Sequence, residues 1–123
     1  MRTWLNASVL FESGPDGTEV LSQDGRGRVD SAMATYLKYV PSNPIVVEGY
    51  STTGTIDERF RQARIRAGIV REYLLGRYEL MPQNTGFISL GNDAKGSPND
   101  EKWDGVAVAL FLETGALQFV AER

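Results

Sequence analysis

The chain has 123 residues, of which 41% are hydrophobic and 24% are charged, and these values are typical of one compact globular domain. It contains no cysteine and no histidine, which excludes disulfides, cysteine-based zinc sites and every catalytic mechanism that needs a thiolate or an imidazole. The net charge of -3 argues against nonspecific binding to nucleic acids, and the apolar runs fall short of the ~18 residues of a membrane span, so we expect no direct membrane insertion.

The first half of the chain predicts a strand, a helix and a second strand. Residues 4–12 are rich in β-branched and aromatic side chains and end at a Ser-Gly-Pro-Asp-Gly turn, as a strand would. Residues 24–40 carry apolar side chains at the spacing of an amphipathic helix, which Pro41 and Pro44 end. The run Ile45–Tyr50 begins with consecutive apolar residues, which is typical of a buried central strand.

The second half predicts a long helix and two strands. The helix covers residues 56–78, with Thr55 as N-cap and Glu58 completing a capping box. Strands follow at 85–92 and 105–113, separated by a polar loop, and residues 114–123 form an extra strand or a tail. The order βαβαββ predicts a single domain over residues 1–123, a two-layer α/β (α+β) sandwich with both helices on one face of a mixed four-stranded sheet.

The second predicted helix carries arginines within its apolar face. At about 100° of rotation per residue, Arg59 and Arg66 fall inside the arc of apolar side chains that should face the core. Arg61 and Arg64 fall on the opposite, solvated side. The first two therefore need an explanation that the other two do not.

Two interpretations are open for such an arginine. A guanidinium keeps its proton in a protein, so a partly buried one needs an anionic or well-satisfied polar partner. In the first interpretation it pairs with an internal acid, such as Glu48 or Asp104, and its stem covers the edge of the core. In the second, Arg66 lies at a rim and receives a carboxylate from a ligand through its planar fork.

Other motifs carry little chemistry. The segment GYSTTGT lacks the lysine of a P-loop, and the acidic loop at residues 93–104 does not match the calcium-binding pattern. No pair of side chains is placed for nucleophilic or acid–base work, so we expect no enzyme, no metal and no cofactor. We expect Trp103 to pack on the rim of the sheet rather than to serve as an exposed binding aromatic.

Four segments, in this order, resemble the OmpA C-terminal-like domain, the module that holds peptidoglycan non-covalently in Gram-negative envelopes. SVLFESG is similar to its first strand, IVVEGYST to the strand ending in Gly-His/Tyr-Thr-Asp, ARIRAGIVREYL to the Leu-Ser-x-x-Arg-Ala helix start, and LGNDAKGSP to the Gly-x-Gly-x-x-x-Pro loop. The resemblance covers most of the chain. It implies an OmpA-like fold, a periplasmic or cell-envelope location, and a fragment of a longer envelope protein. The phrases VEGYSTTGT and WDGVAVALF also resemble the tail domain of MCE-type (MlaD-like) lipid-transport proteins.

The resemblance also implies where a ligand would bind. The family grips the amine and the carboxylate of diaminopimelate with an aspartate after its second strand and an arginine at its second helix. The arginine carries over to Arg66, but the aspartate falls on Thr52, in a segment one residue shorter than usual. The family's asparagine falls near Arg59, and its basic Asn-Arg-Arg falls on the Trp-Asp-Gly around Asp104. Because a hydroxyl supplies no countercharge to an ammonium, we expect peptidoglycan binding to be weak or lost.

Two functions follow from these observations. The first is a non-enzymatic binding module for peptidoglycan stem peptides or another carboxylate, which uses Arg66 with Thr52 and Ser51, and with Arg59 and Asp104 at the rim. The second is a structural or protein-interaction domain of an envelope transport or assembly protein, in which the pocket is degenerate and Arg66 pairs with an internal acid, Asp104 or Glu48. If Thr52 marks a lost aspartate, we expect Thr52→Asp to restore part of the binding.

Overall fold

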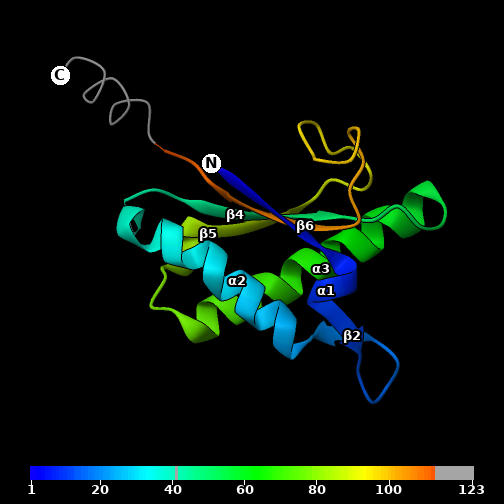
Figure 1. Ribbon diagram of the computed structural model, residues 1–123, viewed down its shortest axis with the longest axis horizontal. Coiled ribbons are helices and arrows are strands. Elements are labelled where there is room, and N and C mark those ends of the chain that lie inside the picture. The colour runs from blue at the N-terminus through cyan, green and yellow to red at the C-terminus, as the bar shows by residue number, and fades with distance from the viewer. Residues whose placement is uncertain (41, 113–123) are drawn as a thin grey trace.

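The computed structural model describes residues 1–40 and 42–112. Its main sheet has the strand order β1-β6-β4-β5, formed by β1 (Arg2–Asn6), β6 (Gly105–Leu110), β4 (Ile45–Tyr50) and β5 (Thr85–Ser89). The pairs β1–β6 and β6–β4 are antiparallel, whereas β4 and β5 are parallel. The two long helices, α2 (Gln23–Tyr36) and α3 (Ile56–Arg77), lie on the same face of this sheet (Figure 1). The predicted fold, a two-layer sandwich on a mixed four-stranded sheet, is confirmed.

The start of the chain differs from the prediction of one strand over residues 4–12. The strand β1 ends at Asn6, a short helix α1 (Ala7–Leu10) follows, and β2 (Phe11–Ser13) pairs with β3 (Glu19–Leu21) in a separate hairpin. The break has a local cause, because the Asn6 side chain accepts a hydrogen bond from the backbone N–H of Ser8 and caps the helical turn. The expected turn is present, and Gly17 occupies the left-handed region at φ 85°.

The other predicted elements agree more closely. The strand β4 has the predicted bounds, and α3 begins after Thr55 with both hydrogen bonds of the capping box. The first predicted helix ends at Tyr36, and its last predicted turn becomes a 3-10 turn, η1 (Leu37–Tyr39). Another 3-10 turn, η2 (Pro82–Asn84), precedes β5. Both late strands are shorter than predicted. Residues 114–123, predicted as an extra strand or a tail, lie outside the described residues.

The main core fills the space between the sheet and the helices. It takes alternate residues of the central strands and the sheet-facing side of α2 and α3, with the fully buried side chains of Met33, Val47, Val70, Leu74 and Val108. The opposite face of the sheet is covered in part by the loop between β5 and β6, where Trp103 and Ala94 pack near Trp4 and Tyr50. On this second face Arg2 donates to both carboxylate oxygens of Glu48, at 2.7 and 2.8 Å.

A hydrogen-bonded cluster joins α2 to the C-terminal end of α3. Asp30 of α2 accepts hydrogen bonds from the hydroxyls of Tyr73, at 2.9 Å, and Tyr78, at 2.6 Å. Desolvation, and then the hydrogen bond to Asp30, raise the pKa of Tyr78, and the same causes raise the pKa of Tyr73. The fold therefore favours the neutral phenol at both positions.

This cluster predicts loss of stability in alkali. A tyrosine whose pKa is raised by folding contributes its stabilisation fully below its unfolded pKa of about 10, and this contribution is lost as the pH rises above that value. We expect the free energy of unfolding to fall between pH 10 and 11.5, and to fall less steeply in Tyr78→Phe. Urea titrations at several pH values measure this slope. The control is Tyr39→Phe, which should keep the slope of the wild type; an unchanged slope in Tyr78→Phe would assign the alkaline loss to other groups.

Candidate functional site

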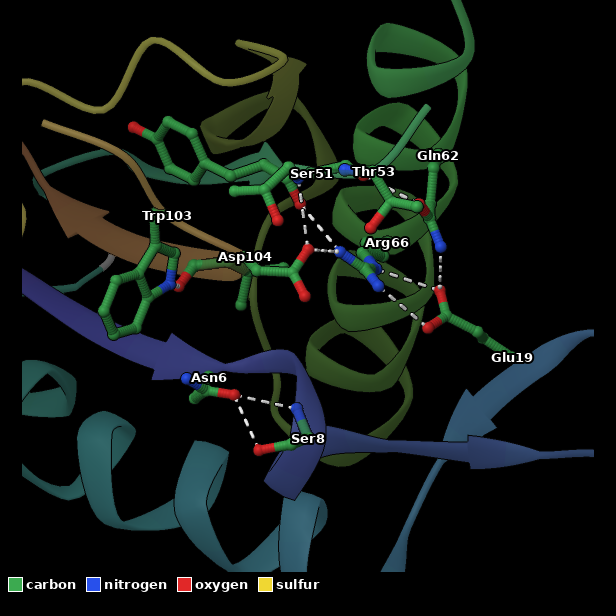
Figure 2. A network of polar contacts seen from close by, with 12 residues as sticks. Asn6, Ser8, Glu19, Ser51, Thr53, Gln62, Arg66, Trp103 and Asp104 are labelled. Carbon is green, nitrogen blue, oxygen red and sulfur yellow. Dashed lines mark hydrogen bonds and ion pairs between the residues drawn. The ribbon is translucent and has the colours of Figure 1, made fainter. Parts of the chain in front are cut away.

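The candidate site is built around the guanidinium of Arg66, on the sheet-facing side of α3. Its side chain is only 6% exposed, and the buried residues next to it on the helix are Ala63, Ala67 and Val70. The Arg66 side chain lies among labelled polar groups from three separate parts of the chain (Figure 2). The prediction that this arginine is held within the apolar face of the helix is confirmed.

Two carboxylates and a carbonyl take up the donors of this guanidinium. Arg66 Nε and Nη2 donate to the two oxygens of Glu19, at 2.9 and 3.1 Å. Arg66 Nη1 donates to Asp104 Oδ1 at 2.7 Å and to the backbone oxygen of Tyr50 at 3.0 Å. Burial alone would lower the pKa of Arg66, but the hydrogen bonds to Glu19 and Asp104 outweigh it and raise that pKa. Of the five N–H groups of an arginine, four are engaged within the chain.

The acid partners come from segments far away in sequence. Glu19 begins β3, so the small hairpin brings it to α3, and Asp104 directly precedes β6. Both acids keep contact with water, because their side chains are 29% and 39% exposed. One guanidinium therefore faces two carboxylates, and this group of three, which we call the Arg66 triad, carries a formal charge of -1.

Ser51 and Thr52, the other predicted ligand-binding residues, bond to neighbours of the Arg66 guanidinium. Ser51 is fully buried, and its hydroxyl donates to Gln62 Oε1 at 2.7 Å. Thr52 is exposed, and its backbone N–H donates to Asp104 Oδ1 at 3.3 Å. Position 52 lacks the acid that the resemblance places there, and the carboxylate of Asp104 accepts a hydrogen bond from the backbone of this residue.

The expectation that Arg59 faces the core is wrong, whereas its part in ligand binding stays a prediction. Arg59 lies in the first turn of α3, where the helix extends beyond the core, and it is half-exposed. Its guanidinium donates to the carbonyl oxygen of Gly54 at 3.1 Å and makes no contact with the Arg66 triad. The helical period shows which face of a helix is apolar, but it does not show how much of that face the sheet covers. Arg61 and Arg64 are exposed, as predicted.

Glu48 and Trp103 have structural roles. Glu48, one of the two acids expected to pair with an arginine of α3, instead pairs with Arg2 on the opposite face of the sheet. Strand β4 alternates its side chains between the two faces, so Glu48 and Val47 point in opposite directions. Trp103 packs at the sheet as predicted, with its indole N–H donating to the carbonyl oxygens of Leu5, at 3.1 Å, and Val106, at 3.2 Å.

Glu19 was missed by sequence reasoning, although a signal for it exists. Residues 11–13 and 19–21 flank a Gly-Pro-Asp-Gly segment, which is the pattern of a short hairpin. The prediction of a single strand over residues 4–12 assigned residues 11 and 12 to that strand, so the hairpin was not recognised. The hairpin brings Glu19 next to Gln62, whose amide lies 3.5 Å from Glu19 Oε1.

An open cleft adjoins the triad between the tip of the hairpin and the first half of α3. Its volume is about 410 Å³, and Thr18, Glu19, Gly54, Gln62 and Ile65 are among its lining residues. Arg61 and Glu58 also line it, so the cleft carries both signs of charge.

Within residues 1–40 and 42–112, no group of three or more metal-ligating side chains lies together. No helix in the same ranges is long and apolar enough to cross a membrane.

Comparison with known proteins gives a fold. No protein-family model and no curated protein sequence matches the chain. The periplasmic domain of Helicobacter pylori MotB superposes with a TM-score of 0.68 at 20% identity, covering 98% of this chain and 88% of that chain. The peptidoglycan-associated lipoprotein from Burkholderia pseudomallei gives a TM-score of 0.54 at 20% identity, covering 76% and 81%. The OmpA-like domain of FopA1 from Francisella tularensis gives 0.57 at 17% identity, covering 75% and 63%.

These neighbours agree with the first resemblance drawn from the sequence and leave the second, to MCE-type tail domains, a prediction. At such identities the likeness concerns the arrangement of the backbone and not the ligand. The chain has the OmpA-like fold of the MotB periplasmic domain and the peptidoglycan-associated lipoprotein.

Proposed function

We propose that the chain is a non-enzymatic domain of the cell envelope with a structural or protein-interaction role, in which the pocket at Arg66 is closed by the chain's own carboxylates. The periplasmic and envelope proteins among its structural neighbours support this location. Peptidoglycan binding through Arg66 is weak or lost, and the partner is another envelope protein.

The single observation that carries this proposal is that acceptors of the chain itself take up four of the five N–H groups of Arg66. Glu19 occupies the Nε and Nη2 edge in the bidentate manner that a ligand carboxylate would use, and Asp104 occupies Nη1. A third carboxylate would approach a group whose formal charge is already -1. It would also have to displace a charge-assisted hydrogen bond, which is worth about 1.5–3 kcal/mol.

A second candidate function is supported by Glu19 itself. Its carboxylate occupies the Nε and Nη2 edge of Arg66, so the geometry there suits a carboxylate, and the 410 Å³ cleft opens next to it. In this alternative the hairpin that carries Glu19 moves aside, and a peptidoglycan stem peptide or another carboxylate takes its place on Arg66. Ser51 and Thr52 then lie beside the ligand.

Co-sedimentation with peptidoglycan sacculi separates the two candidates. We expect the wild type to sediment no more than Arg66→Ala at low and at high salt, and Glu19→Gln to gain nothing. The matched control is Glu12→Gln, an exposed acid in the same hairpin. Binding that appears in Glu19→Gln and disappears in Glu19→Gln/Arg66→Ala would instead establish the carboxylate site, with Glu19 as its internal competitor.

The geometry changes the expectation for Thr52→Asp. A carboxylate at position 52 would be the third acid around one guanidinium, since Asp104 Oδ1 lies only 3.3 Å from the Thr52 nitrogen. We therefore expect Thr52→Asp alone to restore no sacculus binding. The double variant Thr52→Asp/Asp104→Asn removes this repulsion and is the fair test of the family's two-part grip. Sacculus binding by Thr52→Asp alone would show that Asp104 moves away from Arg66 when the ligand binds.

A further inference from the structure

A second cleft, of about 160 Å³, lies along β1, an outer strand of the sheet, and has no part in the Arg66 triad. We call it the tryptophan cleft. Its lining residues are Trp4, Leu5, Asn6, Val9, Leu10, Arg28 and Trp103. It combines elements from both ends of the chain and from α2, so only the folded domain contains it.

The two tryptophans form a fixed aromatic wall. Their ring centroids lie 5.6 Å apart with the planes at 66°, which is a favourable edge-to-face arrangement. The indole N–H of Trp103 is already bonded to the carbonyl oxygens of Leu5 and Val106. Both rings are half-buried, so each still presents part of its surface to water. This wall offers an apolar contact that loses little conformational entropy when it is covered.

Arg28 gives the tryptophan cleft its charge. It is exposed and is the only charged residue that lines this cleft. Within the part of the chain that the structure describes, no acid lies within ion-pair distance of Arg28, although Asp24 is one helical turn away. The cleft therefore pairs an apolar wall with one unused guanidinium, which is complementary to an aliphatic group with a neighbouring carboxylate.

We propose that the tryptophan cleft docks a protein partner, which places an aliphatic side chain against Trp4 and Trp103 and an adjacent carboxylate on Arg28. This inference rests on the proposed role as an interaction domain and names the surface and the chemistry of the partner. Tryptophan and arginine are the residue types that dominate the energetic centres of protein interfaces. Because β1 has no strand on its outer side among the described residues, its backbone favours a peptide over a glycan as the occupant.

Two indole N–H signals give a direct assay, because the chain has only two tryptophans. The probes are two capped dipeptides, N-acetyl-leucyl-aspartate amide and N-acetyl-leucyl-lysine amide, titrated into the 15N-labelled domain. We expect the acidic probe to shift both indole signals saturably, and the basic probe to bind about tenfold more weakly, a difference of about 1.4 kcal/mol. The whole 123-residue chain is used.

Charge reversal tests the role of the guanidinium. Arg28→Glu should exchange the preference of the two probes, because the carboxylate then repels the acidic probe and attracts the basic one. Arg26→Glu is the matched control, since Arg26 is exposed on the same helix but does not line the cleft. It should keep the preference of the wild type. If Arg28→Glu and Arg26→Glu behave alike, the proposal is wrong.

Three other results would also overturn the proposal. Absence of a saturable shift with the acidic probe would mean that the cleft is only a packing feature. Shifts with an N-acetylglucosamine disaccharide but not with the peptides would assign the cleft to a glycan. Shifts that depend on protein concentration alone would assign it to a second copy of the chain. Sacculus binding through Arg66 would contradict the proposed function without changing the indole assay, because Arg66 does not line this cleft.

Discussion

Replacing Arg66 with methionine is expected to lower the free energy of unfolding by about 2–3 kcal/mol. Methionine fills the space of the aliphatic stem but leaves Glu19 and Asp104 facing each other without the cation between them. Removing one member of a buried ion pair typically costs about 3–5 kcal/mol. The expected loss is smaller here because water reaches both acids, whose side chains are 29% and 39% exposed.

Urea denaturation measures this loss, and two further variants locate its cause. Arg61→Met, at an exposed position of the same helix, should stay within about 0.5 kcal/mol of the wild type. Glu19→Gln/Asp104→Asn in the Arg66→Met background should recover part of the stability, since the uncompensated charges are then gone. If Arg66→Met proves as stable as the wild type, the triad contributes no net stability and apolar packing replaces it fully.

Gly49→Ala is expected to lower the free energy of unfolding by about 3 kcal/mol or more. Gly49 lies in β4, directly beneath α3, and a Cβ there would overlap the backbone oxygen of Ala63. The same Cβ would lie 2.6 Å from the carbonyl carbon of Ala63 and 3.0 Å from the Cβ of Ala67. Backbone atoms cannot turn away, so α3 would have to move off the strand.

Thermal unfolding followed by circular dichroism checks this result. The control is Gly86→Ala in the neighbouring strand β5, where the nearest side-chain atom, Cγ2 of Val46, would be at an ordinary 3.8 Å. Gly49→Ala/Ala67→Gly should recover little, because it removes only the side-chain contact and leaves the clash with the backbone of Ala63. Equal melting temperatures for Gly49→Ala and Gly86→Ala would show that the helix shifts at no cost.

The close approach at Gly49 also matters for the candidate site. The next residue in β4, Tyr50, supplies the carbonyl oxygen that accepts a hydrogen bond from Arg66 at 3.0 Å. A helix that packed farther from the strand would carry the guanidinium away from this oxygen. The glycine therefore sets the depth at which Arg66 is buried, and a variant at position 49 should weaken the triad together with the core.

Local patterns in the sequence were sufficient to predict α3 and β4 and to place Arg66 on the core-facing side of its helix. The capping box at Thr55 and the apolar run at Ile45–Tyr50 are determined by neighbouring residues, so α3 and β4 were predicted closely. The helical period was sufficient to place Arg66 on the core-facing side. These features depend on contacts within about one turn or one strand, which a sequence displays directly.

The choice of partner for Arg66 was decided only by the tertiary structure. The sequence left Glu48, Asp104 and a ligand carboxylate as alternatives, and it did not indicate Glu19, which lies 47 residues away and reaches Arg66 through a separate hairpin. The alternation of β4 sent Glu48 to the other face, where Arg2 binds it. An ion pair depends on the positions of charged groups in space, and several acids of equal chemistry compete for each arginine. The order of residues therefore showed that Arg66 needs an anionic or well-satisfied polar partner. The packing of the hairpin, the helix and the start of β6 determined that the chain itself supplies two carboxylates.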